Sequence, residues 1–315
     1  MTDPVAGGRG PQVVGDLLGR QAMALDRDLA AGLLGLPLAS IPKAAAPGQD
    51  ERGYQVVRGV AAIQLRGILT PNYEFARWMG WTTYHGLAAT CAELAAADDV
   101  QAVAIEADSP GGMVLGVEAA AEAVAQLAAV KPVHVLVNPL AASAAYWIAA
   151  GATEVVLTPG AMVGSIGVGL QTYSFVAPSQ IYGEQWFMMT STHARAKWPD
   201  AATPEGQIEL QRSLDETEVK FHGAVAAGRG IPLADLATRL TVTADPRDGG
   251  AVFSGQDAIT RGLADRQEVA QAFYDRLFAA HGQKPAAPAK GRGRANAAAA
   301  AAAMAQVAAA RLISG

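Results

Sequence analysis

Short runs of apolar and β-branched residues alternate along the chain with longer stretches in which apolar residues recur every three or four positions. The short runs predict strands and the longer stretches predict helices. The expected strands cover residues 60–65, 100–106, 133–137, 154–157 and 186–189. The expected helices cover residues 84–97, 115–130, 142–150, 204–227, 255–261 and 268–280. This alternation is typical of an α/β domain with mainly parallel strands.

Two of these predicted elements carry further detail. The strands at 100–106 and 133–137 are apolar on both faces, which predicts that they lie inside the sheet. The helix at 204–227 has recognisable ends: Thr203 can cap its start, Pro204 suits its first position, and Gly230 follows its end. We therefore expect a long, well-defined helix after residue 203.

The ends of the chain differ from its middle. Residues 1–55 mix short apolar pieces with glycine and proline, and we interpret them as a loosely packed N-terminal lead-in with one or two short helices. Residues 283–315 contain lysine and arginine without aspartate or glutamate around a run of alanines, which predicts a flexible, basic, alanine-rich tail. A single main domain is expected over residues 56–282.

Composition narrows the class of protein. The chain has 315 residues, of which 51% are hydrophobic and 17% charged, so it can bury a large core. Its formal net charge of −5 disfavours a nucleic-acid partner. The single cysteine, Cys91, excludes an intramolecular disulfide and a multi-cysteine zinc site, and we expect it to be an apolar helix residue. The N-terminus lacks a secretory pattern, and the longest apolar stretch, 139–152, is shorter than the roughly 20 residues of a membrane span, so a soluble protein is expected.

The first segment that could carry chemistry is the sequence Ser109-Pro110-Gly111-Gly112, which follows the predicted strand at 100–106. Glycines let a backbone approach where a Cβ would block it. Backbone N–H groups left unpaired at such a turn can bind a peptide carbonyl or a developing oxyanion. The alternative interpretation is an ordinary turn between a strand and a helix.

The second segment is centred on Ser143, which is expected to open an alanine-rich helix after a turn at Asn138-Pro139. Small neighbours allow a substrate backbone to come close. The start of a helix carries a partial positive charge that favours an alkoxide or oxyanion. The alternative is a serine that simply caps the helix.

Two more segments follow: a glycine-rich stretch that contains Ser165, and a polar stretch that contains His193 and Lys197. A lysine acts as a general base only if its pKa falls from about 10.4 toward neutrality, which burial can cause. Trp198 and Pro199 are neighbours that could bury Lys197. Taken alone, however, a lysine in a polar loop is usually a solvated charge.

Together, these segments and the later sequence Val252-Phe253-Ser254-Gly255 occur in an order that resembles the signal peptide peptidase A family of serine peptidases over residues 57–275. The resemblance implies that Ser143 is the nucleophile and Lys197 the general base of a Ser-Lys dyad, with Ser165 orienting the lysine. It also implies an oxyanion hole formed by backbone N–H groups at Gly112 and Ala144. Neither a cofactor nor a metal is implied.

The resemblance implies a ClpP/crotonase-like fold, which is a spiral of β-β-α units. It further implies a homo-oligomer whose active sites can use residues from neighbouring subunits. The sequence Ser143-Ala144-Ala145-Tyr146-Trp147 is more similar to the bacteriophage and prophage branch, whose members are head-maturation proteases. The partners implied are a peptide or protein substrate, with phage scaffold, portal or capsid proteins among the candidates. The implied location is the cytoplasm of a bacterial host or an assembling prohead.

Several alternatives stay open. The same motifs could belong to a cellular peptidase that degrades signal peptides, and the same fold could serve a crotonase-type acyl-CoA enzyme. A ClpP-like Ser-His-Asp peptidase would need a histidine base, for which His193 is the remaining rival among five histidines. The basic tail would also suit a capsid scaffold protein without catalysis.

Overall fold

A computed structural model describes residues 22–26, 33–34, 54–170, 172, 180–181, 184–185 and 189–282. The tail predicted at 283–315 lies outside these residues, as does most of the strand predicted at 186–189. None of the described helices is long and apolar enough to cross a membrane.

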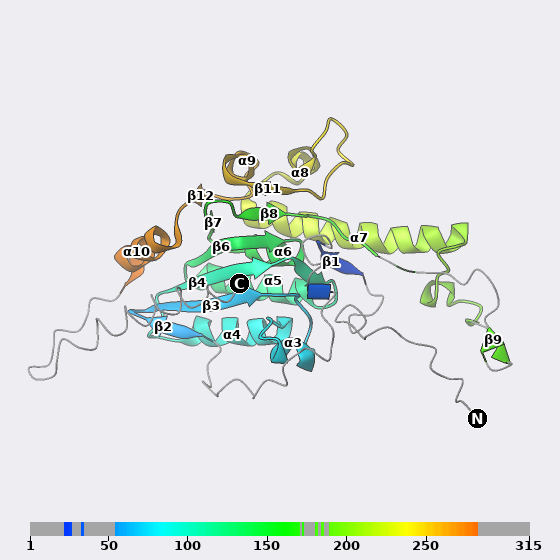
Figure 1. Ribbon diagram of the computed structural model, residues 1–315, viewed down its shortest axis with the longest axis horizontal. Coiled ribbons are helices and arrows are strands. Elements are labelled where there is room, and N and C mark those ends of the chain that lie inside the picture. The colour runs from blue at the N-terminus through cyan, green and yellow to red at the C-terminus, as the bar shows by residue number, and fades with distance from the viewer. Residues whose placement is uncertain are drawn as a thin grey trace, which may run out of the picture. The chain divides into compact units, whose positions relative to one another are not determined.

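The described part of the chain is built on a sheet of eight strands (Figure 1). Their bounds are β2 Gln55–Val57, β3 Val60–Arg66, β4 Ala102–Ser109, β6 Val133–Ala142, β7 Glu154–Leu157, β8 Met162–Gly164, β11 Val252–Ser254 and β12 Arg266–Gln267. The central strands β3, β4 and β6 are parallel, whereas β2 and β11 are antiparallel to their neighbours at the two ends. The first half of β6 pairs with β7 and its last residues pair with β8. The prediction of an α/β domain with mainly parallel strands is confirmed.

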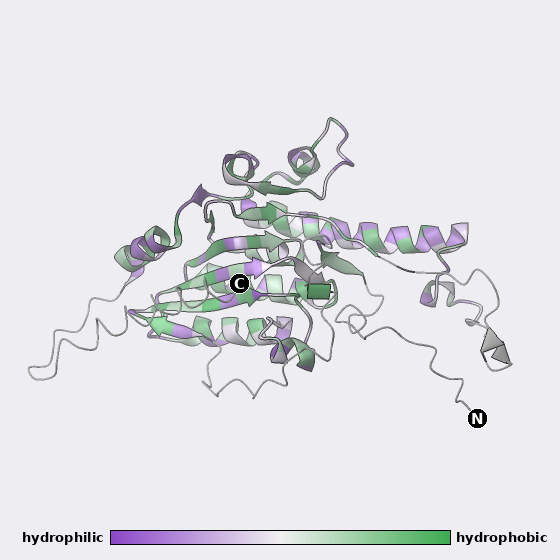
Figure 2. Ribbon diagram, viewed as in Figure 1, coloured by the Kyte–Doolittle hydropathy of each residue, from purple (hydrophilic) through white to green (hydrophobic). Residues whose placement is uncertain are grey.

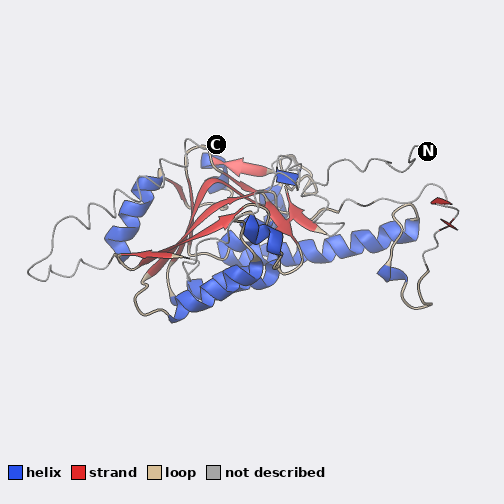
Figure 3. Cartoon of the chain, turned by 60° about the horizontal axis from the view of Figure 1, so that its bottom comes forward, coloured by secondary structure: helices blue, strands red, loops and turns tan. Residues whose placement is uncertain are grey.

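Helices cover the two faces of this sheet. Their bounds are α3 Glu74–Trp78, α4 Tyr84–Ala96, α5 Val117–Val130, α6 Ala144–Ala149, α7 Pro204–Arg229, α8 Leu233–Leu240, α9 Gly255–Thr260 and α10 Ala270–His281. Helices α4 and α5 lie together against one face of the sheet (Figure 3). Helix α10 covers the other, where Phe273 and Leu277 pack on Val60 and Leu136. The hydrophobic strands and the more hydrophilic α7 stand out in Figure 2.

The order of elements repeats. Strands β2 and β3 lead to α4, and strands β4 and β5 (Gly111–Met113) lead to α5. This is the β-β-α order that the predicted spiral requires. Cys91 is buried on α4, as expected, and burial raises its pKa to about 11, which keeps the thiol protonated at neutral pH.

Strand β6 departs from the prediction. The sequence indicated a turn at Asn138-Pro139, but the strand continues through a cis Asn138–Pro139 peptide to Ala142. Its register against β4 shifts at this place, and the residues beyond it gain a new partner in β8. Tertiary pairing therefore overrides the local turn signal, and the strand delivers Ser143 directly to the start of α6.

Helix α7 has the predicted ends. The hydroxyl of Thr203 accepts a hydrogen bond from the Gly206 N–H at 3.0 Å, and Gly230 ends the helix at a φ of 62°. Its second half is fixed to the domain by Phe221, whose ring stacks on that of Trp147 at 4.4 Å between centroids. The first half of α7 extends beyond the sheet (Figure 1).

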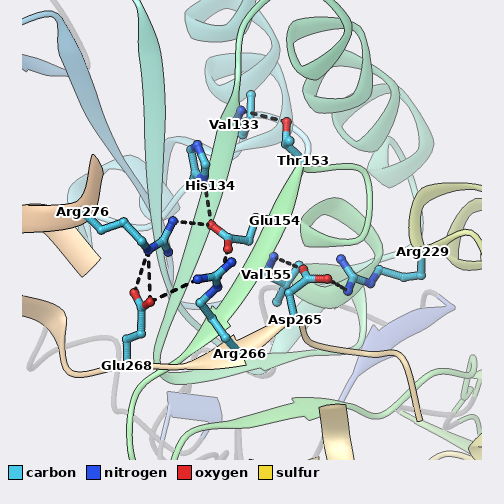
Figure 4. A network of polar contacts seen from close by, with 10 residues as sticks. All are labelled: Val133, His134, Thr153, Glu154, Val155, Arg229, Asp265, Arg266, Glu268 and Arg276. Carbon is cyan, nitrogen blue, oxygen red and sulfur yellow. Dashed lines mark hydrogen bonds and ion pairs between the residues drawn. The ribbon is translucent and has the colours of Figure 1, made fainter. Parts of the chain in front are cut away.

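An ion network centred on the buried Glu154 holds the C-terminal elements on the sheet (Figure 4). Glu154 on β7 contacts His134 on β6 at 2.8 Å, Arg266 on β12 at 2.6 Å and Arg276 on α10 at 3.0 Å. Burial alone would raise the pKa of Glu154, but the hydrogen bond from His134 and the charges of the two arginines hold it below its usual value. The ionised carboxylate thereby links four elements.

Candidate active site

Ser143 stands at the junction of β6 and α6 and is 1% exposed. Its φ of 55° and ψ of −122° are a combination that residues other than glycine rarely adopt, at a cost of roughly 1–3 kcal/mol. Its N–H donates to the Gly164 carbonyl at 2.7 Å, and its own carbonyl accepts from the Trp147 N–H at 2.8 Å. The side chain makes no capping hydrogen bond, so Ser143 does not serve as an ordinary helix cap.

The backbone of Gly111 packs directly against Ser143. A Cβ at Gly111 would lie 2.9 Å from the Cβ of Ser143 and 3.0 Å from the Ala142 carbonyl oxygen. The φ of Gly111 is 105°, which also favours glycine. Ser109 fixes this segment, since its buried hydroxyl donates to the Gly67 carbonyl at 2.6 Å and accepts from the Gly111 N–H at 3.2 Å. The sequence did not point to this role of Ser109.

Gly112 belongs to β5, so the predicted turn after Ser109 is in fact a short strand. Its neighbour on one side is Leu69: a Cβ at Gly112 would lie 2.0 Å from the Leu69 carbonyl oxygen. On the other side Gly112 pairs with Ala24 of β1, Met23–Leu25. The lead-in is therefore not loosely packed at this place.

Ala144 is the first residue of α6 and is fully buried. The N–H groups in the first turn of a helix have no acceptor within the helix. The N–H of Ala144 is thus a donor next to Ser143, together with the partial positive charge of the helix start.

Ser165 follows Gly164, the residue whose carbonyl holds the N–H of Ser143. It is partly buried, has a φ of 52°, and donates its own N–H to the Ala251 carbonyl at 2.7 Å. The structure thus brings Ser165 close to the backbone of Ser143.

Lys197 is placed differently. It ends a short 3-10 helix, Arg195–Lys197, is exposed, and has its ammonium 5.4 Å from the ring centroid of Trp198. Trp198 is itself 51% exposed, so the expected burial of Lys197 is wrong for the single chain. The reason is that this segment precedes the projecting end of α7.

The rise of α7 gives the distance between Glu218 and the start of this helix at Pro204. Glu218 of α7 lies near the glycine-rich segment that contains Ser165, because its carboxylate is 3.7 Å from a Cβ built on Gly167. From Glu218 back to Pro204 the helix is about 20 Å long. Bonds between residues 200–201 and the first turn of α7, such as Gln207 Nε2 to the Ala201 carbonyl, keep the preceding loop at that far end. The Lys197 segment therefore lies by the N-terminal end of α7, where the ammonium of Lys197 contacts the ring of Trp198.

The remaining candidates for catalysis lie elsewhere. His193 is exposed in the same segment as Lys197. His134 belongs to the ion network of Glu154. Among the described residues, no group of three His, Cys, Asp or Glu side chains is arranged to hold a metal ion. The site is therefore a serine between glycine-rich backbone segments.

A strained serine at a helix start, in a mixed α/β domain and next to backbone N–H donors, is an arrangement that acyl-transfer hydrolases use. Residues 125–284 match the model of peptidase family S49. This match covers half of the chain, and the chain belongs to that family.

Two relatives are viral. "Capsid assembly protease C" of Escherichia phage lambda is 31% identical over 69% of this chain and 48% of its own length. "Head-tail preconnector protein GP5" of Enterobacteria phage P21 is 30% identical over 77% of this chain and 50% of its own length. The chain thus spans about half the length of these relatives. A solved structure, of the 1510-N membrane-bound stomatin-specific protease S97A mutant, aligns with a TM-score of 0.41 at 15% identity, over 70% of this chain and 86% of that one.

Proposed function

We propose that the chain is a serine endopeptidase in which Ser143 is the nucleophile and Lys197 the general base. The observation that carries the proposal is the conformation of Ser143. A strained backbone persists where the surrounding structure enforces it, and such residues cluster at functional sites. Here the side chain of Ser143 makes no capping bond, its Cβ lies against Gly111, and its N–H is held by Gly164.

The proposed reaction gives each of these residues a role. The Ser143 hydroxyl attacks the carbonyl carbon of the substrate while the amine of Lys197 takes its proton, and Ser165 orients that amine. Backbone N–H groups of Gly112 and Ala144 stabilise the negative oxygen of the tetrahedral intermediate. The proton then passes to the leaving amine, and water hydrolyses the ester on Ser143.

We further propose that Lys197 acts on the Ser143 of a neighbouring copy. The exposed position of Lys197 at the far end of α7 supports this arrangement. Leu210 and Leu214 in the projecting half of α7 are only partly buried, which leaves an apolar stripe for contact with a second chain. The active form is accordingly a homo-oligomer.

A mixing experiment tests the shared dyad. Ser143→Ala and Lys197→Ala are each expected to abolish digestion of casein. When the two purified variants are dissociated and assembled together, activity should return, because the lysine of one chain meets the serine of the other. A mixture as inactive as its components would contradict the shared dyad. Retained activity of Lys197→Ala, with loss in His193→Ala, would assign the base to His193.

The biological substrate is proposed from the relatives. Both viral relatives carry names that refer to head or capsid assembly. We propose that this chain cleaves scaffold, portal or capsid proteins during head maturation, inside an assembling prohead in the bacterial host. Coexpression with phage capsid and scaffold proteins tests this: the wild type should cleave them, and Ser143→Ala should leave them at full length. Cleavage of signal peptides, with the head proteins untouched, would favour the cellular alternative.

A further inference from the structure

Strand β1 lies against the candidate active site. It pairs antiparallel with β5, with Ala24 opposite Gly112. On its other side, Met23 exchanges two hydrogen bonds of 2.9 Å with Gly169. Residues 23–25 are thus held as an extended strand between two segments of the candidate active site. Extended peptides commonly bind to proteins in this way, by adding a strand to an exposed edge.

The register places one particular carbonyl at the site. The Val114 N–H donates to the Ala22 carbonyl, and the Asp26 N–H donates to the Pro110 carbonyl. Hydrogen-bonded pairs alternate in an antiparallel ladder, so the pair midway between them, Ala24 and Gly112, is also hydrogen-bonded. The carbonyl of Ala24 therefore faces the N–H group that the proposed mechanism assigns to the oxyanion.

The same carbonyl lies close to the nucleophile. A Cβ built on Gly111 would be 2.3 Å from the Ala24 carbonyl oxygen and 2.9 Å from the Cβ of Ser143. The Ala24 oxygen and the Ser143 Cβ therefore lie close to each other, on either side of Gly111. The side chain of Ala24 is fully buried in the main core, whereas Met23 and Leu25 pack on the cluster around Trp81. Only a small side chain fits at position 24.

We propose that residues 22–26 are an internal substrate of the chain's own active site, cleaved between Ala24 and Leu25. This inference rests on the proposed function of Ser143. The Ser143 oxygen bonds to the Ala24 carbonyl carbon, the bond to the Leu25 nitrogen breaks, and that nitrogen receives the serine proton through the base. Water then adds to the ester, which frees Ser143 and releases residues 1–24. Until that step, β1 occupies the site and excludes other substrates.

Intact-mass spectrometry of the assembled full-length protein tests the proposal, with casein digestion as a parallel measurement. The wild type is expected to lose residues 1–24, to begin at Leu25, and to digest casein after a lag that matches this loss. Ser143→Ala should keep residues 1–24. Ala24→Arg and Leu25→Pro should also keep them yet digest casein without a lag, because arginine does not fit the buried position and proline holds φ near about −65°, away from that of a paired strand, so that β1 no longer occupies the site. The control Ala6→Arg should be cleaved like the wild type.

Three results would overturn the proposal. The first is a wild type that digests casein through Ser143 but retains residues 1–24 or is cut elsewhere. The second is cleavage at Leu25 in Ser143→Ala or in either strand variant. In both cases the proposed function survives. The third is a wild type that neither loses residues 1–24 nor digests casein, which refutes the proposed function and the inference together.

Discussion

The backbone strain at Ser143 gives a stability prediction that separates function from folding. Glycine adopts a φ of 55° with a ψ of −122° without the steric cost that a Cβ imposes. Replacing Ser143 by glycine should therefore recover roughly 1–3 kcal/mol of strain. The greater flexibility of glycine in the unfolded chain costs about 0.5–1 kcal/mol in return. The net effect is a gain of roughly 1 kcal/mol over Ser143→Ala, which retains the strain.

Thermal unfolding of the two variants, at one protein concentration, measures this difference. Both lack the hydroxyl and should be inactive, but Ser143→Gly should melt about 2–4 °C above Ser143→Ala. A matched pair at Ser213, an exposed position inside α7, calibrates the ordinary cost of glycine. There the glycine variant should melt below the alanine variant. If the glycine variant is the less stable of the pair at both positions, Ser143 is not strained and the reasoning is refuted.

Three further predictions follow from the packing. Gly111→Ala should abolish labelling of Ser143 by a fluorophosphonate probe. The control Gly80→Ala should be labelled normally, because Gly80 has a φ of 69° but nothing lies within 4 Å of a Cβ built on it. Equal labelling of the two variants would refute the close approach of Gly111 to Ser143. Phe221→Ala should lower the free energy of unfolding in urea by about 3–5 kcal/mol, and a loss below 1 kcal/mol would show that its ring stack does not anchor α7. The folded-state pKa of Glu154 lies below its usual value of 4.5, so the ionised carboxylate stabilises the fold fully above pH 4.5, and this stabilisation declines as the pH falls through the folded-state pKa. Glu154→Gln should therefore flatten the acid part of the curve of unfolding free energy against pH. An unchanged slope would contradict the lowered pKa of Glu154.

The sequence predicted those parts of the fold that local pattern determines. The strands at β3, β4 and β7 and the helices α4 and α7 lie within a few residues of their predicted bounds, since their apolar periodicity and caps are read directly from neighbouring residues. Local pattern failed at Pro139. The sequence there predicted a turn, but the strand continues because its next residues pair with β8, which lies more than twenty residues further along the chain.

Strand β1 shows a different limit. Three residues, Met23-Ala24-Leu25, carry no periodicity, and their partners in β5 are far away in the sequence. Strand β1 fits against β5 only because Gly111 has no Cβ, which would lie 2.3 Å from the Ala24 carbonyl oxygen. A search for short apolar pieces with a small central residue could have drawn attention to this segment, but not to its register.

Local and long-range structure also explain why the predicted surroundings of Ser143 and Lys197 differ in how well they agree with the structure. Ser143 lies among backbone segments so close that Gly111 has no space for a Cβ, which makes its neighbourhood a property of the single chain. Lys197 lies on an exposed segment before the projecting half of α7, where no core fixes it to the sheet. If Lys197 of a neighbouring copy is the base, as proposed, then a single chain has the nucleophile Ser143, with strand β1 beside it, but lacks the base. Hydrolysis would then begin only once copies of the chain have assembled.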